Sequence, residues 1–282
     1  MPSASPKPSV LPKLGIIAGQ GELPALMVDA AKAQDRPAFI LALEGQTAPD
    51  LVAGIEHAWV RLGAIGGAID ALRDAGCGEV VFAGAVKRPS LLKLGLDGRG
   101  AKLFAKLGKA ALGDDRLLTI LVKELEGEGL SVVGADDVLA GLLVEEGILG
   151  RHRPDQSAAI DIALGLDVAK AVGAMDVGQA VVVQQGVVLG VEGVEGTDAL
   201  IARCAELARE GPAGVLVKIK KPSQERRVDL PTIGVGTVRA AVRAGLRGIV
   251  IEAGGTLVLH RDKVVGTADE AGLFLVAADL SI

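Results

Sequence analysis

Short apolar runs alternate with helix-compatible stretches along the first half of the chain, and this alternation constrains the fold most strongly. The runs typical of buried strands lie at 14–18, 36–45, 57–63 and 79–86. Pro24 suits the first turn of the helix that would follow the first run. Strands separated by helices predict a parallel sheet wound with helices, because parallel neighbours need long crossover connections.

The second half has a different pattern, in which a long helix precedes a hairpin. The stretch QAVVVQQGVVLGVEG indicates two strands joined by a Gln-Gly turn. Between the two halves, Glu145–Gln156 loses periodicity and gathers charge, Gly and Pro, as linkers do. We therefore predict an α/β fold of two domains, an N-terminal Rossmann-like parallel sheet over residues 13–146 and a C-terminal mixed α/β domain over residues 155–282.

Composition excludes several classes of protein. With 282 residues, 50% of them hydrophobic and a mean hydropathy of +0.43, the chain has ample material for a core. A net charge of -5 and an aromatic content of 2% argue against nucleic-acid binding. The segment MPSASPKPSVLP lacks an apolar core and predicts a flexible tail, and no apolar stretch reaches about 18 residues. We expect a cytoplasmic protein that works in solution or at a membrane surface.

Cysteine and histidine usage limits the chemistry further. Cys77 and Cys204 are far apart and lie in apolar or helical surroundings, so both are expected to be reduced core residues. None of the three histidines has a partner at metal-ligand or triad spacing. Carboxylates with a hard divalent cation are then the more economical route to an activated water.

The N-terminal half offers two candidate binding segments. Gly19, Gln20 and Gly21 follow the first strand, where bare N–H groups and a helix start could receive a phosphate. Pro24 stands where a dinucleotide fingerprint has its third glycine, so a nucleotide or phosphate site and a plain tight turn both remain open. Lys87 and Arg88 follow the fourth strand at the edge where α/β sheets bind ligands, although they could also be a solvated pair.

Carboxylates flank the predicted hairpin on both sides. Asp176 and Gln179 precede it, and Glu195, Thr197 and Asp198 follow it, so the hairpin would bring both groups to one end of the sheet. Asp176, Glu195 and Asp198 are the candidate ligands for a divalent cation. Turn formation and helix capping are the alternative roles for all of these residues.

A charged segment lies between Pro222 and Pro231. Proline is a poor continuation of a helix or central strand, so the segment predicts a rigid loop directly after a buried strand. A plain solvated loop would account for Lys220 and Arg226 but not for polar residues set between two prolines. The candidate functional residues of this loop and its flanks are Lys221, Gln224, Arg227, Asp229 and Thr232.

Six motifs occur here in an order and spacing that match a known family: LGIIAGQGELP, GAVKRP, GDDRLL, MDVGQAVVV, VEGTDALIAR and KPSQERRVDLPTIG. Over nearly the whole chain, from about Leu14 onward, the sequence resembles the UDP-2,3-diacylglucosamine pyrophosphatases of lipid A biosynthesis, the LpxI family. The tail before Lys13 is an extension relative to that pattern.

The resemblance implies a cytoplasmic enzyme, peripheral to the inner membrane, that uses Mg²⁺ or another divalent cation. It would hydrolyse UDP-2,3-diacylglucosamine to UMP and 2,3-diacylglucosamine 1-phosphate, known as lipid X. The N-terminal domain would bind the nucleotide, and the C-terminal domain would carry catalysis and lipid binding. Asp229 matches the family's essential acid, while Gly19, Gly21, Lys87 and Arg88 match motif positions of its N-terminal domain.

These considerations define the candidate site. The expected catalytic residues are Asp229, Gln224 and Arg227, and the expected metal ligands are Asp176, Glu195 and Asp198. Substrate contacts are expected from Gly19, Gln20, Gly21, Lys87, Arg88, Gln179, Thr197, Lys221 and Thr232. A non-catalytic nucleotide- or lipid-sensing protein and a Rossmann oxidoreductase are the competing hypotheses, and the oligomeric state is open.

Overall fold

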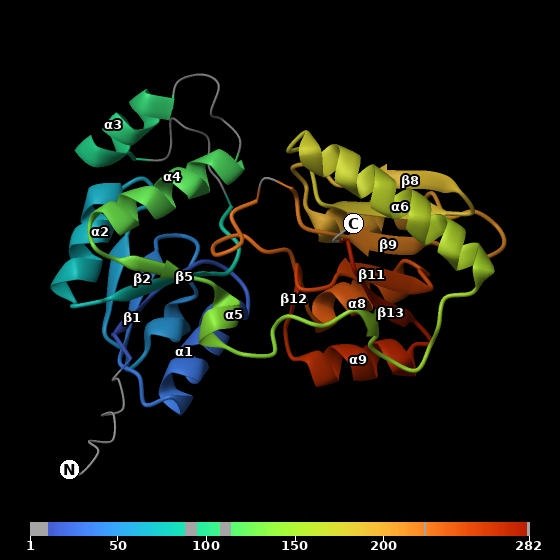
Figure 1. Cartoon of the computed structure of the whole chain (residues 1–282), viewed down its shortest axis with the longest axis horizontal. Coiled ribbons are helices and arrows are strands. Elements are labelled where there is room, and N and C mark those ends of the chain that lie inside the picture. Colours follow the sequence, from blue (N-terminus) through green and yellow to red (C-terminus); the bar gives the residue numbers. More distant parts are fainter. Residues whose placement is uncertain (1–10, 88–94, 108–113, 223, 281–282) are drawn as a thin grey trace, which may run out of the picture. The chain divides into compact units, whose positions relative to one another are not determined.

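The computed structural model describes residues 11–87, 95–107, 114–222 and 224–280. The chain forms two compact units that separate between Leu139 and Ala140 (Figure 1). The predicted linker, Glu145–Gln156, lies inside the second unit, where Gly147–Ile148 (β6) pairs with the edge of a sheet. Two strand residues are too few to leave a periodic signal in the sequence. The predicted N-terminal tail falls mostly on residues 1–10, outside the described residues.

The first unit is the predicted Rossmann-like half, a five-stranded sheet of order β3-β2-β1-β4-β5 in which all pairs are parallel. The chain reverses its winding between β1 and β4, which is where doubly wound sheets bind ligands. Its elements are β1 (Leu14–Ala18), α1 (Leu23–Ala33), β2 (Ala38–Leu43), η1 (Pro49–Val52), β3 (His57–Val60), α2 (Ile65–Asp74), β4 (Glu79–Ala83), α3 (Gly98–Leu107), α4 (Asp114–Gly127), β5 (Ser131–Val133) and α5 (Ala135–Val138).

The second unit is a mixed sheet of order β6-β13-β11-β9-β7-β8, in which β9, β11 and β13 are parallel and β7 is antiparallel to β9. The predicted hairpin is β7–β8, and its turn residues Gln185 and Gly186 both have positive φ. The elements besides β6 are α6 (Gln156–Ala174), β7 (Ala180–Gln184), β8 (Val187–Val191), α7 (Thr197–Ala205), β9 (Val215–Lys218), β10 (Thr232–Ile233), α8 (Val235–Arg243), β11 (Gly248–Glu252), β12 (Leu257–Val258), α9 (Arg261–Glu270) and β13 (Phe274–Ala278).

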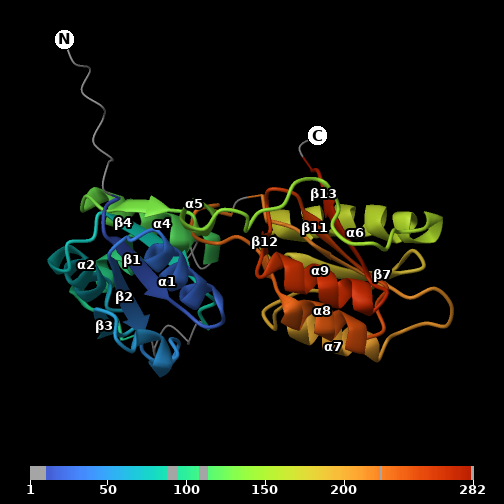
Figure 2. The same ribbon diagram turned by 90° about the horizontal axis from the view of Figure 1, so that it is seen from below.

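Helices cover both faces of this second sheet (Figure 2). Alternate residues of β7 face opposite ways, so Val181 and Val183 pack toward α6 while Ala180 and Val182 join the core beneath α7, α8 and α9. Gly165 lets α6 approach the sheet closely, because a Cβ there would lie 2.5 Å from a methyl group of Val217. The central strands β7, β9 and β11 are therefore buried on both faces, and their ends are where polar chemistry can lie.

Both cysteines are free and buried, as the sequence predicted. Burial raises the pKa of Cys77 to about 11, and burial also raises the pKa of Cys204. Neither thiol is therefore suited to act as a nucleophile near neutral pH. None of the helices in the described parts of the chain is long and apolar enough to cross a bilayer.

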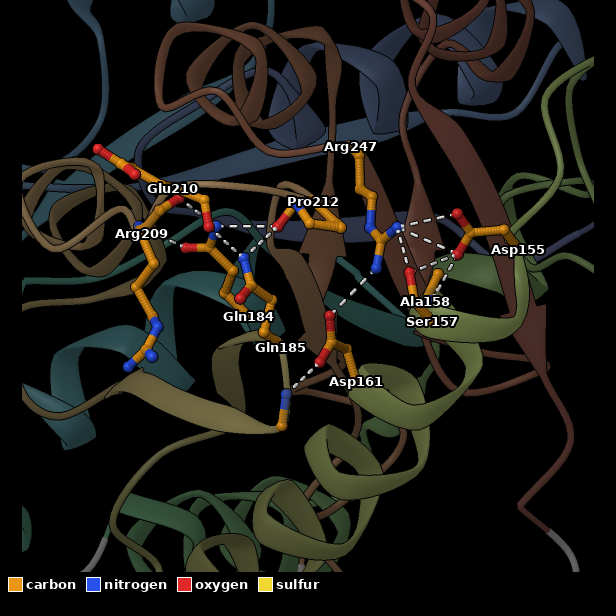
Figure 3. A network of polar contacts seen from close by, with 11 residues as sticks. Asp155, Ser157, Ala158, Asp161, Gln184, Gln185, Arg209, Glu210, Pro212 and Arg247 are labelled. Carbon is orange, nitrogen blue, oxygen red and sulfur yellow. Dashed lines mark hydrogen bonds and ion pairs between the residues drawn. The ribbon is translucent and has the colours of Figure 1, made fainter.

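A buried polar network holds together the edge of the second sheet at which β9 and β11 begin (Figure 3). Asp161 of α6 is fully buried and accepts hydrogen bonds from the Gly186 N–H at 2.7 Å and from Arg247 at 3.2 Å. The same guanidinium reaches Asp155, the N-cap of α6, at 3.1 Å. Beside it, the Gln184 amide donates to two carbonyls of the loop before β9, those of Arg209 and Pro212.

This network generates a stability prediction. Asp161→Ala leaves the turn N–H and part of the Arg247 guanidinium without a partner, so we expect it to lower the free energy of unfolding by about 1.5–3 kcal/mol. Asp167→Ala, at an exposed position on the same helix, is the control and is expected to have little effect. Urea titrations of both variants check this, and equal midpoints for the two would contradict a structural role for Asp161.

Candidate active site

The candidate site lies where β9 ends. Because β7 runs antiparallel to β9, Ala180 at the start of β7 pairs with Lys218 at the end of β9. β8 returns antiparallel to β7, so Val191 at its end pairs with Val181 at the same edge. Three segments that are distant in sequence therefore meet there: 176–179, 192–198 and 218–232.

Glu192 joins the first two segments. Its carboxylate is buried, with 6% of the residue exposed, and accepts from the Gln179 N–H at 3.2 Å and the Thr197 hydroxyl at 2.9 Å. Gly178 permits this close approach, since a Cβ there would lie 2.0 Å from the Glu192 carbonyl oxygen. These contacts confirm that the hairpin brings the residues before it and after it to one edge.

Gln224 organises the loop between the two prolines. Its side chain is buried, and its amide nitrogen donates to the Asp229 carboxylate at 2.6 Å and lies 3.5 Å from the side-chain oxygen of Gln179. Its own oxygen accepts from the Lys221 N–H at 3.1 Å. The loop is closed at its far end because Pro231 accepts the Leu257 N–H at 2.8 Å and β10 pairs with β12. Asp229 is partly exposed, so water can reach the carboxylate that Gln224 holds.

Lys221 and Asp176 form an ion pair of 2.6 Å that links the same loop to the segment before β7. Asp176 has a φ of 56°, in the left-handed region, which Asp tolerates better than most residues. The ion pair thus joins two of the predicted site residues directly.

Lys218 lies at the centre of this site and was not among the residues predicted from sequence. Only 7% of the residue is exposed, and its ammonium donates to the Thr232 carbonyl at 2.9 Å. Burial lowers the pKa of Lys218, and the negative charges of Glu192, Asp198 and Asp229 oppose that shift. Lys218 and Glu192 each carry a charge within or just after an apolar run, and this was the signal that could have revealed them.

The remaining predicted residues of the second unit make other contacts. Arg227 is paired with Glu225 at 3.0 Å, and its hydrogen bond holds the pKa of that carboxyl below its usual value. Glu195 is paired with Arg203 at 3.0 Å on the surface, and Asp198 lies in the first turn of α7.

The predicted metal ligands Asp176, Glu195 and Asp198 do not form one centre. Within the described residues, no group of three or more His, Cys, Asp or Glu is placed to hold a metal ion. The donor set present therefore does not fit a cation caged by the protein. Asp176 and Glu195 are each neutralised by a separate cation, Lys221 and Arg203.

In the first unit, the glycine loop uses part of its hydrogen-bonding capacity internally. The Gly19 N–H donates to the Ala83 carbonyl at 2.8 Å, and the Gln20 N–H donates to the Ala85 carbonyl at 2.7 Å. A Cβ at Gly19 would lie 2.5 Å from the Ala85 oxygen, so this glycine permits backbone packing. Any phosphate bound here would have to use Gly21 and the start of α1.

The other predicted contacts of the first unit lie after β4. The backbone of Lys87 is held by the Gln46 side chain, which accepts its N–H at 2.9 Å and donates to its carbonyl at 3.2 Å. These bonds fix the backbone of Lys87 four residues after the end of β4. Arg88 lies outside the described residues.

The residues of the second unit supply the parts that hydrolysis of a phosphate ester needs. A partly exposed carboxylate is oriented by a buried amide, and Lys221 lies on the segment that carries it. Such an arrangement can orient a water and respond to the charge of a bound phosphate.

Comparisons with known proteins agree with the motifs. A family model described as the LpxI N-terminal domain matches residues 13–142, and one described as the LpxI C-terminal domain matches residues 145–276. A protein of Caulobacter vibrioides named UDP-2,3-diacylglucosamine pyrophosphatase LpxI is 43% identical over 274 residues, which cover 95% of this chain and 98% of that protein.

Similarity to solved structures is weak. CobK precorrin-6A reductase has a TM-score of 0.34 at 15% identity over 95% of this chain and 88% of that one. N5-carboxyaminoimidazole synthase from Aspergillus clavatus has a TM-score of 0.28 at 14% identity over 73% and 46% of the two chains. TM-scores this low establish no shared fold. The two family models and the full-length relative, by contrast, agree with each other and with the six motifs, and the chain therefore belongs to the LpxI family.

Proposed function

We propose that this protein hydrolyses the pyrophosphate bond of UDP-2,3-diacylglucosamine and releases UMP and 2,3-diacylglucosamine 1-phosphate. Membership of the LpxI family and the activity for which the Caulobacter vibrioides relative is named support this choice of substrate. The observation that carries the proposal is the Gln224–Asp229 hydrogen bond of 2.6 Å, which holds a solvent-accessible carboxylate beside a buried lysine.

In the proposed reaction, Asp229 accepts a proton from the attacking water. The water oxygen forms a bond to one phosphorus, and the bond from that phosphorus to the bridging oxygen breaks. The leaving phosphate keeps the electron pair of the broken bond. Gln224 keeps the Asp229 carboxylate in one orientation, which is needed because proton transfer requires a well-placed acceptor.

We further propose that Mg²⁺ or another divalent cation is required. In the three segments of the site, the acids nearly balance the cations, so the protein offers little net positive charge to a pyrophosphate. The acids are Asp176, Glu192, Glu195, Asp198, Glu225 and Asp229, and the cations are Lys218, Lys220, Lys221, Arg226 and Arg227. Magnesium commonly binds through substrate phosphates and only one or two carboxylates, so a cation carried by the substrate does not need a protein cage. Such a cation would neutralise phosphate charge.

The lipid-linked substrate places the proposed reaction at the cytoplasmic surface of the inner membrane. A substrate with two acyl chains stays in the bilayer, so the enzyme must work beside it. This location is part of the proposal.

Asp229→Asn tests the role of the carboxylate. The amide keeps the shape of the side chain but cannot take a proton, so we expect kcat to fall by about 10²–10⁴-fold while substrate still binds. Asp262→Asn, an exposed acid at the start of α9, is the control. The measurement is the rate of UMP release, and a wild-type rate in Asp229→Asn would contradict the proposed mechanism. Substrate binding by the wild type with no UMP release would instead favour a sensing protein.

Gln224→Leu tests the orientation of Asp229. Loss of the amide frees the carboxylate to rotate, and we expect kcat to fall by up to about 100-fold with little change in KM. Gln156→Leu replaces an exposed amide at the start of α6 and should leave activity unchanged. An equal fall of kcat in both variants would show that Gln224 affects activity only through the stability of the fold.

Metal removal is tested with EDTA. We expect chelation to abolish UMP release and added Mg²⁺ to restore it, because the site has little net positive charge with which to neutralise a pyrophosphate. Unchanged UMP release in EDTA would refute the cation requirement while leaving the hydrolytic function intact.

A further inference from the structure

The buried ammonium of Lys218 is a group that the proposed reaction does not use. Lys218 is the last residue of β9, and the apolar residues before it in the strand, Val215, Leu216 and Val217, are fully buried. An ammonium has three donors, and among the described residues its one recorded acceptor is the Thr232 carbonyl. Burying a charge is costly, so a lysine in this position needs a compensating role.

The groups around Lys218 come from three different segments. Glu192 follows β8, Asp198 lies in the first turn of α7, and Asp229 lies in the loop before β10. The hydrogen bond to Thr232 fixes the chain three residues after Asp229. Lys218 therefore connects the rigid sheet to the far end of the loop, while Gln224 holds the loop from its other side.

We propose that Lys218 is a positioning residue of this site, whose buried ammonium anchors the 224–232 loop through the Thr232 carbonyl and balances the charges of Glu192, Asp198 and Asp229. It acts through Asp229 and makes no contact with substrate. This inference rests on the proposed function where it concerns turnover. Where it concerns the conformation of the loop, it can be tested without any activity.

Lys218→Met is the main test, because methionine has a similar volume and removes the charge. Replacing a buried ion by an apolar group of similar size is often neutral or stabilising for the fold. We expect the urea midpoint of Lys218→Met to equal or exceed that of the wild type, while kcat falls by about 100-fold and KM changes little. Lys170→Met, at an exposed position on α6, is the matched control and should keep full activity.

Limited trypsin digestion measures how accessible the 224–232 loop is to cleavage, and it does not depend on activity. Arg226 and Arg227 lie in the loop, so release of its Thr232 anchor should speed cleavage after these residues in Lys218→Met and not in Lys170→Met. Lys218→Leu, which also removes both the charge and the donor, replaces Lys218→Met in both arms if the methionine variant fails to fold.

The measurement of kcat and the digestion of the loop together distinguish a wrong role for Lys218 from a wrong proposed function. If the wild type releases no UMP, the proposed function is wrong, and the digestion arm alone decides the role of Lys218. Unchanged loop cleavage in Lys218→Met overturns the inference, and so does a kcat equal to that of Lys170→Met in an active enzyme. A parallel loss of stability and activity would show that Lys218 is merely structural.

Discussion

The antiparallel pairing of β7 with β9 is the contact on which the candidate site depends. A parallel β7 would place Gln179 at the opposite end of the sheet from Lys218, and the Glu192 contacts would be lost with it. The type of turn at Gln185 and Gly186 then sets the register of β8. Because helices cover both faces of the sheet, polar side chains gather at its two ends, and those of the candidate site lie at the end where β9 finishes.

A carboxylate and an ammonium group, those of Glu192 and Lys218, are buried at that edge. Burying either charge without compensating partners would destabilise the fold. Glu192 is satisfied by a backbone N–H and a hydroxyl, whereas Lys218 has a carbonyl and the field of nearby carboxylates. Buried ionic groups seldom maximise stability, and they are better explained by a need to hold one arrangement of polar groups. The same site geometry supports both the hydrolysis that we propose and the anchoring role of Lys218.

Much of the fold was predictable because it rests on local patterns. Apolar runs with intervening helices predicted the parallel sheet of the first unit, Pro24 is in the first turn of α1, and the Gln-Gly turn is present. The strand β6 was missed because two residues carry no periodicity. The predicted metal ligands illustrate a different limit, since Glu195 turns to Arg203 and Asp176 to Lys221. Sequence proximity to the hairpin could not show which partner each carboxylate would take.

By itself, the sequence determined the α/β class, the hairpin, a loop between Pro222 and Pro231, and the family, because each depends on residues near one another or on motif order. Only the tertiary structure decided that Gln224 donates to Asp229, that Arg227 pairs with Glu225, and that Lys218 and Glu192 are buried at the same edge. Those outcomes depend on strand order and register between distant segments. The sequence does not distinguish a charged residue in an apolar run that is exposed to solvent from one that is buried in a functional site.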